Sequence, residues 1–387
     1  MAGDTVTAQT TTPGPAADTP LRIRTVTAEN VLTPAGAAIG ALGLDWVLFE
    51  RVLPFSGVLG FWVSWYVLFL VFYTAIAAFQ WDIQSVRDKF FSVAFSTGGV
   101  LATAIVIDQV AYTLVRGFAA ARYPGFITQT MANAGPLSPV YVGGVAHALV
   151  GTMEQILLAT LLSVPLGILA AVYLAEVGGR AAGPVRTLVD AMTSLPDIIS
   201  GLFILAFAVL TIGLPKSGFT ASLALAVTML PIVTRASETV LRIVPGTLRE
   251  ASYALGGSQW RTVLNVVLPT ARSGLATAVV LAIARGIGET APVLLVAGFA
   301  RGMNANPFNG WQTSLPLYIY YEIQSPAPAD KIRAFGGGFA LVILVLVLFT
   351  IARRIGGGTP GELTRRQRRR LDEQSARQVA ARKGTSE

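Results

Sequence analysis

The sequence contains no cysteine and only one histidine, and it is poor in charge. Without cysteine the chain has no disulfide framework, no thiol nucleophile and no thiolate-ligated metal, and the single histidine, His147, argues against a metal site. No G-x-x-x-x-G-K-S/T phosphate loop occurs, so the chain is not expected to hydrolyse ATP. We therefore expect no catalytic residue, no bound metal and no enzyme activity.

Charged residues make up 13% of the 387 residues, against about 25% in soluble proteins, and the mean hydropathy is +0.61. A membrane-spanning helix needs about 20 apolar residues. Eight apolar segments can be drawn, at about residues 33–52, 56–79, 91–116, 147–177, 186–213, 217–240, 271–300 and 334–354. The composition thus predicts an all-α membrane protein. The first segment is the weakest because it contains Asp45, although Gly36 and Gly40 are spaced to let a second helix approach.

The basic residues predict the orientation, because Lys and Arg accumulate in cytoplasmic loops. Ten of the 29 Lys and Arg lie at or beyond Arg353, in a tail that reads TRRQRRR at 364–370. An even number of crossings with both termini in the cytoplasm places this tail beside anionic lipid, and it lacks the reading elements of a nucleic-acid-binding segment. The first 30 residues are rich in Thr, Pro and Ala, which predicts a disordered cytoplasmic tail.

One predicted cytoplasmic loop, residues 242–269, has the pattern of two short amphipathic helices separated by Gly256-Gly257. Pro245 is placed to begin the first helix, and Pro269 is placed to start the next membrane helix. A rigid helix pair with an apolar face between two membrane helices would suit a docking surface. An ordinary connecting loop that packs on its own helices fits this pattern equally well.

The same loop resembles the cytoplasmic "EAA" loop of ATP-binding-cassette importer permeases. The matching positions are Glu250, Ala251, Ser252, Gly256, Val266, Leu268 and Pro269. The family pattern has Ala where Ser252 stands and Ile where Val266 stands. The resemblance implies a type I (MetI-like) six-helix core and a coupling loop that sits in a groove of a separate ATPase. It also implies that the partner ATPase uses the ATP, with no cofactor bound by this chain.

Arg285 and Glu289 are the only charges between Arg272 and Arg301, in the last long apolar segment before the C-terminal helix. Charges in hydrocarbon are costly, so both side chains should face the interior of the helix bundle. Their spacing is one helical turn, which predicts that they pair. An arginine fork can hold two oxygens of an oxyanion, as a phosphate path would require. A structural ion pair that locks the helix is the alternative.

The stretch Thr193–Pro196 interrupts the apolar segment 186–213. A proline there can open the helix and free backbone groups toward a pore, although a kink without function is equally compatible. Asp190 and Asp197 flank the interruption, and we expect them to be solvated at a helix end or paired with Arg186. A cavity-facing role is the alternative.

The stretch ARGIGETAP at 284–292 resembles the phosphate permease family, in which A-R-A-I-G-E-T-A-P marks the PstA-type subunit. Only Gly286 departs from that pattern. The resemblance implies a substrate path that includes Arg285, Glu289 and Thr290. It further implies a bacterial plasma-membrane location and three partners, namely a homologous PstC-type permease, a PstB-type ATPase dimer and an external PstS-type phosphate-binding protein.

These patterns together predict a cytoplasmic tail at 1–30, two extra N-terminal transmembrane helices at 31–85, a permease core at 90–355 and a basic cytoplasmic tail at 356–387. Two alternatives stay open. The first is an importer permease for another oxyanion, such as molybdate or sulfate. The second is a secondary transporter or channel that works without an ATPase.

Overall fold

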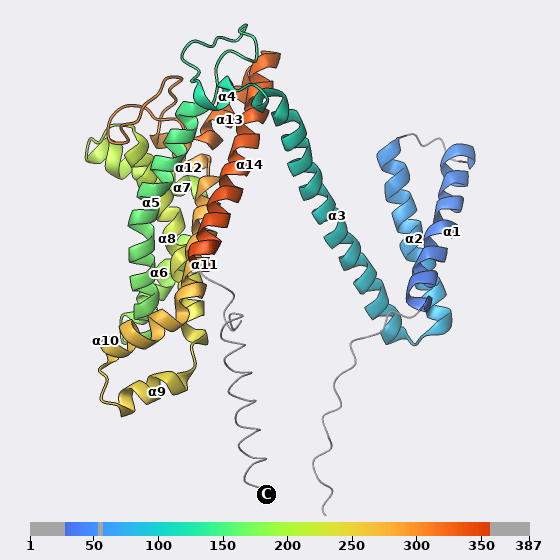
Figure 1. The fold of residues 1–387 in the computed structure, drawn as a ribbon. Helices are drawn as coiled ribbons and strands as arrows, with labels where there is room; N and C mark the ends of the chain where they lie inside the picture. Colours follow the sequence, from blue (N-terminus) through green and yellow to red (C-terminus); the bar gives the residue numbers. More distant parts are fainter. Residues whose placement is uncertain (1–27, 53–56, 357–387) are drawn as a thin grey trace, which may run out of the picture. The chain divides into compact units, whose positions relative to one another are not determined.

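The computed structural model describes residues 28–52 and 57–356 (Figure 1). Every regular element in these residues is helical. The predicted tails lie outside the described residues, except for residues 28–30 and 356, which belong to helices. The chain divides into two compact units, residues 1–108 and 109–387. The elements are α1 (Ala28–Val47), η1 (Leu48–Val52), α2 (Val58–Gln80), α3 (Ile83–Ala121), α4 (Gly125–Thr128), α5 (Ala146–Val172), η2 (Tyr173–Val177), α6 (Ala182–Ser194), α7 (Asp197–Ile204), η3 (Leu205–Thr211), α8 (Gly218–Ile243), α9 (Gly246–Ala254), α10 (Gln259–Thr262), η4 (Val263–Val267), α11 (Leu268–Ile287), α12 (Ala291–Val296), α13 (Leu315–Gln324) and α14 (Pro328–Gly356).

Six helical stretches among the described residues are long and apolar enough to cross a membrane, which confirms the predicted class of all-α membrane protein. Three of the eight predicted segments differ from a straight span. In segment 271–300 the helix ends at Ile287, and the short helix α12 begins only at Ala291. Segment 186–213 is a pair of helices, Ala182–Ser194 and Asp197–Thr211, bent by 105° at the break between them. Segment 33–52 contains the shorter apolar helix Leu32–Val47, followed by a π-helical turn, so its polar end departs from a regular α-helix.

The first unit contains the helical hairpin of α1 and α2, shown in blue in Figure 1. Small side chains allow the contact, because Ala37 and Ala41 are buried against Phe69 and Tyr73. The predicted role of the glycines holds for Gly40, where an added Cβ would lie 3.8 Å from the Phe72 ring of α2. It does not hold for Gly36, where an added side chain would meet nothing within 4 Å.

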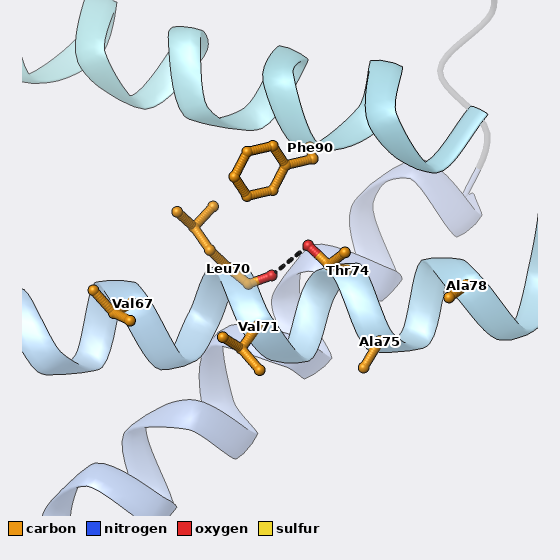
Figure 2. A pocket seen from close by; sticks show the side chains of 7 residues that line it. All are labelled: Val67, Leu70, Val71, Thr74, Ala75, Ala78 and Phe90. Atoms are coloured by element: carbon orange, nitrogen blue, oxygen red, sulfur yellow. Dashed lines mark hydrogen bonds between the residues drawn. The ribbon is translucent and has the colours of Figure 1, made fainter. Parts of the chain in front are cut away.

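Polar groups are also buried in this hairpin. The Ser64 hydroxyl donates to Asp45 Oδ1 at 2.6 Å, and Trp65 Nε1 donates to the carbonyl of Ala38 at 3.1 Å. Beside the hairpin, α2 and the start of α3 form an apolar groove of about 490 Å³ (Figure 2). Its wall includes Val71 and Phe90. The Thr74 hydroxyl, which also lines the groove, donates a hydrogen bond to the carbonyl of Leu70 at 2.6 Å.

The second unit is a bundle in which α8 packs against α5, α7 and α11. Small residues are frequent in the contacts: Ala159, Ala224 and Ala282 are fully buried, and the fully buried Met229 belongs to the same cluster. This composition suits helices in lipid, where close backbone approach supplies van der Waals contact. A Cβ added at Gly167 of α5 would lie 2.7 Å from Val233 of α8, so the glycine permits this approach.

The two ends of the second unit differ. Figure 1 shows α9 and α10 at one end and α4 and α13 at the other. At the α4 end, the fully buried Arg333 donates to the carbonyls of Ser138, Pro139 and Val142 and pairs with Asp330 at 2.6 Å. His147 is also buried there, and the centroid of its ring lies 5.8 Å from that of Tyr318. The connection between α3 and α5 is thereby fixed as a folded surface.

Candidate functional site

Two broken helices face each other in the second unit. The first break separates α6 from α7, because Pro196 has no N–H and keeps Leu195 in an extended conformation, with ψ at 137°. The second break follows α11, which ends at Ile287, whereas α12 begins only at Ala291. The short helices after the two breaks touch directly. A Cβ on Gly201 of α7 would lie 2.7 Å from the backbone of Pro292 in α12.

These breaks bring three charged side chains together. Arg285 Nη2 lies 2.6 Å from Asp197 Oδ2, and Arg285 Nε lies 3.6 Å from Glu289 Oε1. The predicted pairing of Arg285 with Glu289 exists, but its geometry differs from the expectation. Glu289 lies beyond the end of α11, and the closer partner of Arg285 is Asp197, which is 88 positions away in the sequence. We call Arg285, Asp197 and Glu289 the break cluster.

The cluster opens onto a cavity of about 710 Å³. Its wall is formed by α6, α7, α8 and α11, and apolar side chains such as Phe203, Pro231 and Leu281 make up most of it. Arg285 and Asp197 are the charged residues that line it, and Ser200 and Thr228 add hydroxyl groups. The Arg285 side chain is 51% exposed, so the guanidinium is accessible from the cavity.

Glu289 is the most buried of the three, with 15% of its side chain exposed. On one side it approaches Arg285, and it also lines a cavity of only about 10 Å³ together with Gln155 and Ser314. Among the described residues, Gln155 Oε1 and Ser314 Oγ have no hydrogen-bond partner there. Thr290 is half-buried and occupies the N-cap position of α12, but its side chain makes no capping hydrogen bond. The second break is therefore lined with polar groups.

The predicted coupling loop contains the two expected short helices, α9 and α10. Gly256 adopts a φ of +80° in the turn between them, a conformation that glycine accepts without strain. The next residue, Gly257, is also closely packed, because an added Cβ there would lie 2.8 Å from the Ser252 carbonyl oxygen. Pro269 lies in the first turn of α11, as predicted, and α11 follows α10 and η4 in one continuous helical stretch, Gln259–Ile287.

The outer face of this loop is exposed. Glu250 and Ala251 are both exposed, whereas the Ser252 hydroxyl is half-buried and shares a 2.8 Å hydrogen bond with Thr262. Large apolar side chains accompany the glutamate on the surface. They are Leu255 (90% exposed), Trp260 (60%) and Leu264 (57%).

An arginine that sequence reasoning did not single out holds the loop in place. Arg249 forms two hydrogen bonds with Glu176, at 2.6 and 3.0 Å, and donates to the carbonyls of Val244 and Leu241 at 2.6 and 2.9 Å. Gln259 Nε2 adds a bond to the Glu176 carbonyl at 2.7 Å. The start of α9, the end of α8 and the end of η2 are thus joined through one guanidinium.

A second ion network lies between α6 and α8. Asp190 pairs with Arg235, which also lies 3.5 Å from Glu238. Glu238 in turn accepts from Arg186 at 2.9 Å and from Arg242 at 2.7 Å. The expected pairing of the two aspartates with Arg186 is therefore wrong, because Asp190 uses Arg235 and Asp197 uses Arg285.

Comparison with known proteins places these features in a family. Residues 163–357 match the model of binding-protein-dependent transport system inner membrane components, and this range includes the break cluster and the coupling loop. This chain belongs to that family. Membership implies a membrane location and, as partners, an ATPase and an external binding protein.

The relatives include the "Phosphate transport system permease protein PstA 1" of Mycobacterium tuberculosis, which is 38% identical over 273 residues, 70% of this chain and 88% of the relative. The PstA protein of Mycobacterium leprae is 39% identical over 68% of this chain and 86% of that protein. Among solved structures, the MetNI methionine ABC transporter aligns with a TM-score of 0.43 and 24% identity over 55% of this chain and 93% of that chain. The resemblance to PstA-type permeases is confirmed by the named relatives.

Proposed function

We propose that this chain is the permease subunit of an ATP-driven importer that carries inorganic phosphate from an external binding protein into the cytoplasm. The observation that carries the substrate assignment is Arg285, a permanently charged fork that lies at two helix breaks and faces a cavity. Such a fork can bind two oxyanion oxygens and does not lose its proton. The names of the PstA relatives support phosphate as the anion.

The coupling loop supports the proposed partner ATPase, a PstB-type dimer that uses the ATP, while this chain binds no cofactor. Arg249 fixes the loop from behind, which leaves Glu250 and the apolar side chains of Leu255 and Trp260 exposed for a partner groove. A homologous PstC-type permease would complete the pore, and an external PstS-type protein would deliver phosphate.

The proposed orientation has both termini in the cytoplasm of a bacterial cell, with α9 and α10 inside and α4 and α13 outside. The positive-inside bias of the sequence supports it. Because the chain has no cysteine, single cysteines can test it. A cysteine at Ser138 or Asn306 should react with an impermeant reagent added to intact cells, whereas labelling of a cysteine at Ser258 under those conditions would refute the orientation.

The function itself is tested by uptake. Cells that lack this chain should regain uptake of radiolabelled phosphate when the chain is restored together with its partners. Excess unlabelled phosphate should compete with the label, whereas sulfate and molybdate should compete weakly. Restored uptake that sulfate or molybdate blocks better than phosphate would identify another oxyanion, and uptake that needs no ATPase would refute the importer.

A further inference from the structure

Asp197 changes the charge of the substrate path. A pair formed by Arg285 and Glu289 alone would be neutral with the carboxylate ionised. Asp197 adds a second carboxylate to the same guanidinium, so the break cluster carries a net charge of −1 when both acids are ionised. An anion that enters the cavity therefore meets a site whose positive charge is already outnumbered.

The geometry shows which carboxylate holds the arginine. The 2.6 Å contact with Asp197 is a short, charge-assisted hydrogen bond, whereas the 3.6 Å contact with Glu289 is longer than a hydrogen bond. Asp197 also lies on the wall of the large cavity together with Arg285, whereas Glu289 lines the separate small cavity. Asp197 thus occupies the place on the guanidinium that an oxyanion oxygen would take.

The helix ends favour the same position for a negative charge. Asp197 is the first residue of α7, where the helix dipole attracts anions, and Arg285 lies in the last turn of α11, where the dipole attracts cations. The Asp197 carboxylate is therefore stabilised both by the dipole of α7 and by the positive charge of the Arg285 guanidinium. An incoming phosphate would be attracted to the same two groups and would compete with it.

The break provides a way to remove the carboxylate. Asp197 is carried by α7, which packs on α12 through Gly201 and Pro292, whereas Arg285 is carried by α11. A movement of α7 and α12 against α11 by about one ångström would lengthen the short contact beyond hydrogen-bond distance. Switching movements of packed helices have this size or more.

We propose that Asp197 is a latch that occupies the Nη2 donor of Arg285 in the absence of substrate and must separate from it before phosphate can pass. This inference rests on the proposed function, because it assumes that Arg285 meets the transported anion. Asp197 is a positioning residue in this scheme: it does not carry the ion but decides when the arginine is available. Removal of the Asp197 carboxylate should therefore let phosphate pass through the transporter without ATP.

The test uses the complete transporter, this chain with its partner permease and ATPase, reconstituted in vesicles loaded with radiolabelled phosphate. No ATP and no binding protein are added, so the wild type should retain the label. Asp197→Asn preserves the shape of the side chain and removes the carboxylate that meets Arg285, so the cluster loses one acidic group. We expect phosphate efflux to rise on the order of tenfold, the scale of one unit charge within a few ångströms at a half-exposed site.

Two further variants separate a latch from a structural role. Asp197→Glu keeps the charge and should restore most of the tightness, and Asp190→Asn removes a carboxylate that pairs with Arg235, away from the cavity. Efflux is divided by the amount of assembled complex, measured by co-purification of the ATPase. Asp197→Ser serves as the test variant if Asp197→Asn does not assemble.

The outcomes are distinct. Efflux that rises in Asp197→Asn but not in Asp190→Asn supports the latch. Vesicles of Asp197→Asn that stay as tight as the wild type to phosphate, sulfate and molybdate overturn it, and so does an equal leak in Asp190→Asn. Vesicles that leak sulfate or molybdate but not phosphate support the latch and refute phosphate as the substrate.

Discussion

Replacement of Arg249 should loosen the coupling loop. Arg249→Met retains the length and apolar stem of the side chain but removes all four hydrogen bonds that join α9 to η2 and to the end of α8. The Glu176 side chain, only 6% exposed, is then left charged and without its cation. Breaking a buried ion pair from one side costs about 3–5 kcal/mol, and the partial exposure of Arg249 favours the lower figure, about 3 kcal/mol.

The assay for this change is thermal unfolding of the purified complex, combined with the amount of ATPase that co-purifies. Arg249→Met should lower both the melting temperature of the complex and the amount of ATPase that co-purifies with it. A second change, Glu176→Gln, should recover much of the stability because no buried charge remains. Arg261→Met is the matched control, since Arg261 is exposed in the same loop and has no ion-pair partner among the described residues. Equal stability and equal ATPase retention in Arg249→Met and Arg261→Met would refute the anchoring role.

Three further changes test other parts of the chain. Gly256→Val places a branched residue at a φ of +80°, which costs about 1–2 kcal/mol. Phosphate uptake should therefore fall while the amount of protein in the membrane stays normal. The control Gly246→Ala adds a methyl group in open space at the start of α9 and should leave uptake unchanged. Burial, helped by the nearby carboxylate of Asp330, raises the pKa of Glu322 to about 7. The folded protein therefore favours the protonated form of Glu322. The resulting stabilisation is complete below pH about 4.5 and is lost as the pH rises through 7. The variant Glu322→Gln should show a smaller fall of melting temperature between pH 5 and 8, and an unchanged pH dependence would contradict this. Arg285→Gln should abolish uptake, and normal uptake would remove Arg285 from the substrate path.

The parts of the fold predicted well from the sequence are those that local chemistry determines. Gly256 and the prolines at 245 and 196 mark turns because their own backbone preferences do so. The two helices of the coupling loop and the break after α6 were predictable for that reason. The long apolar segments were predictable because length and hydropathy suffice to identify them.

The parts that were missed depend on contacts distant in the sequence. Nothing near Asp197 indicates that its carboxylate meets Arg285, 88 positions away. Helical spacing suggested Glu289 as the single partner, although the chain leaves the helix at Ile287 before it reaches that residue. Arg249 was equally hidden, because a basic residue in a cytoplasmic loop looks like an orientation signal until Glu176 is placed beside it.

The two broken helices also explain how the membrane core can hold charge without a large cost. Two members of the break cluster lie at helix ends whose dipoles suit them, since Arg285 lies in the last turn of α11 and Asp197 is the first residue of α7. In an unbroken helix these charges would lose that support and would face neighbouring side chains alone. The breaks that expose backbone groups therefore also stabilise the charges, and one movement of α7 and α12 could alter both at once. This makes the break cluster the place where a change of helix position changes the electrostatics of the path.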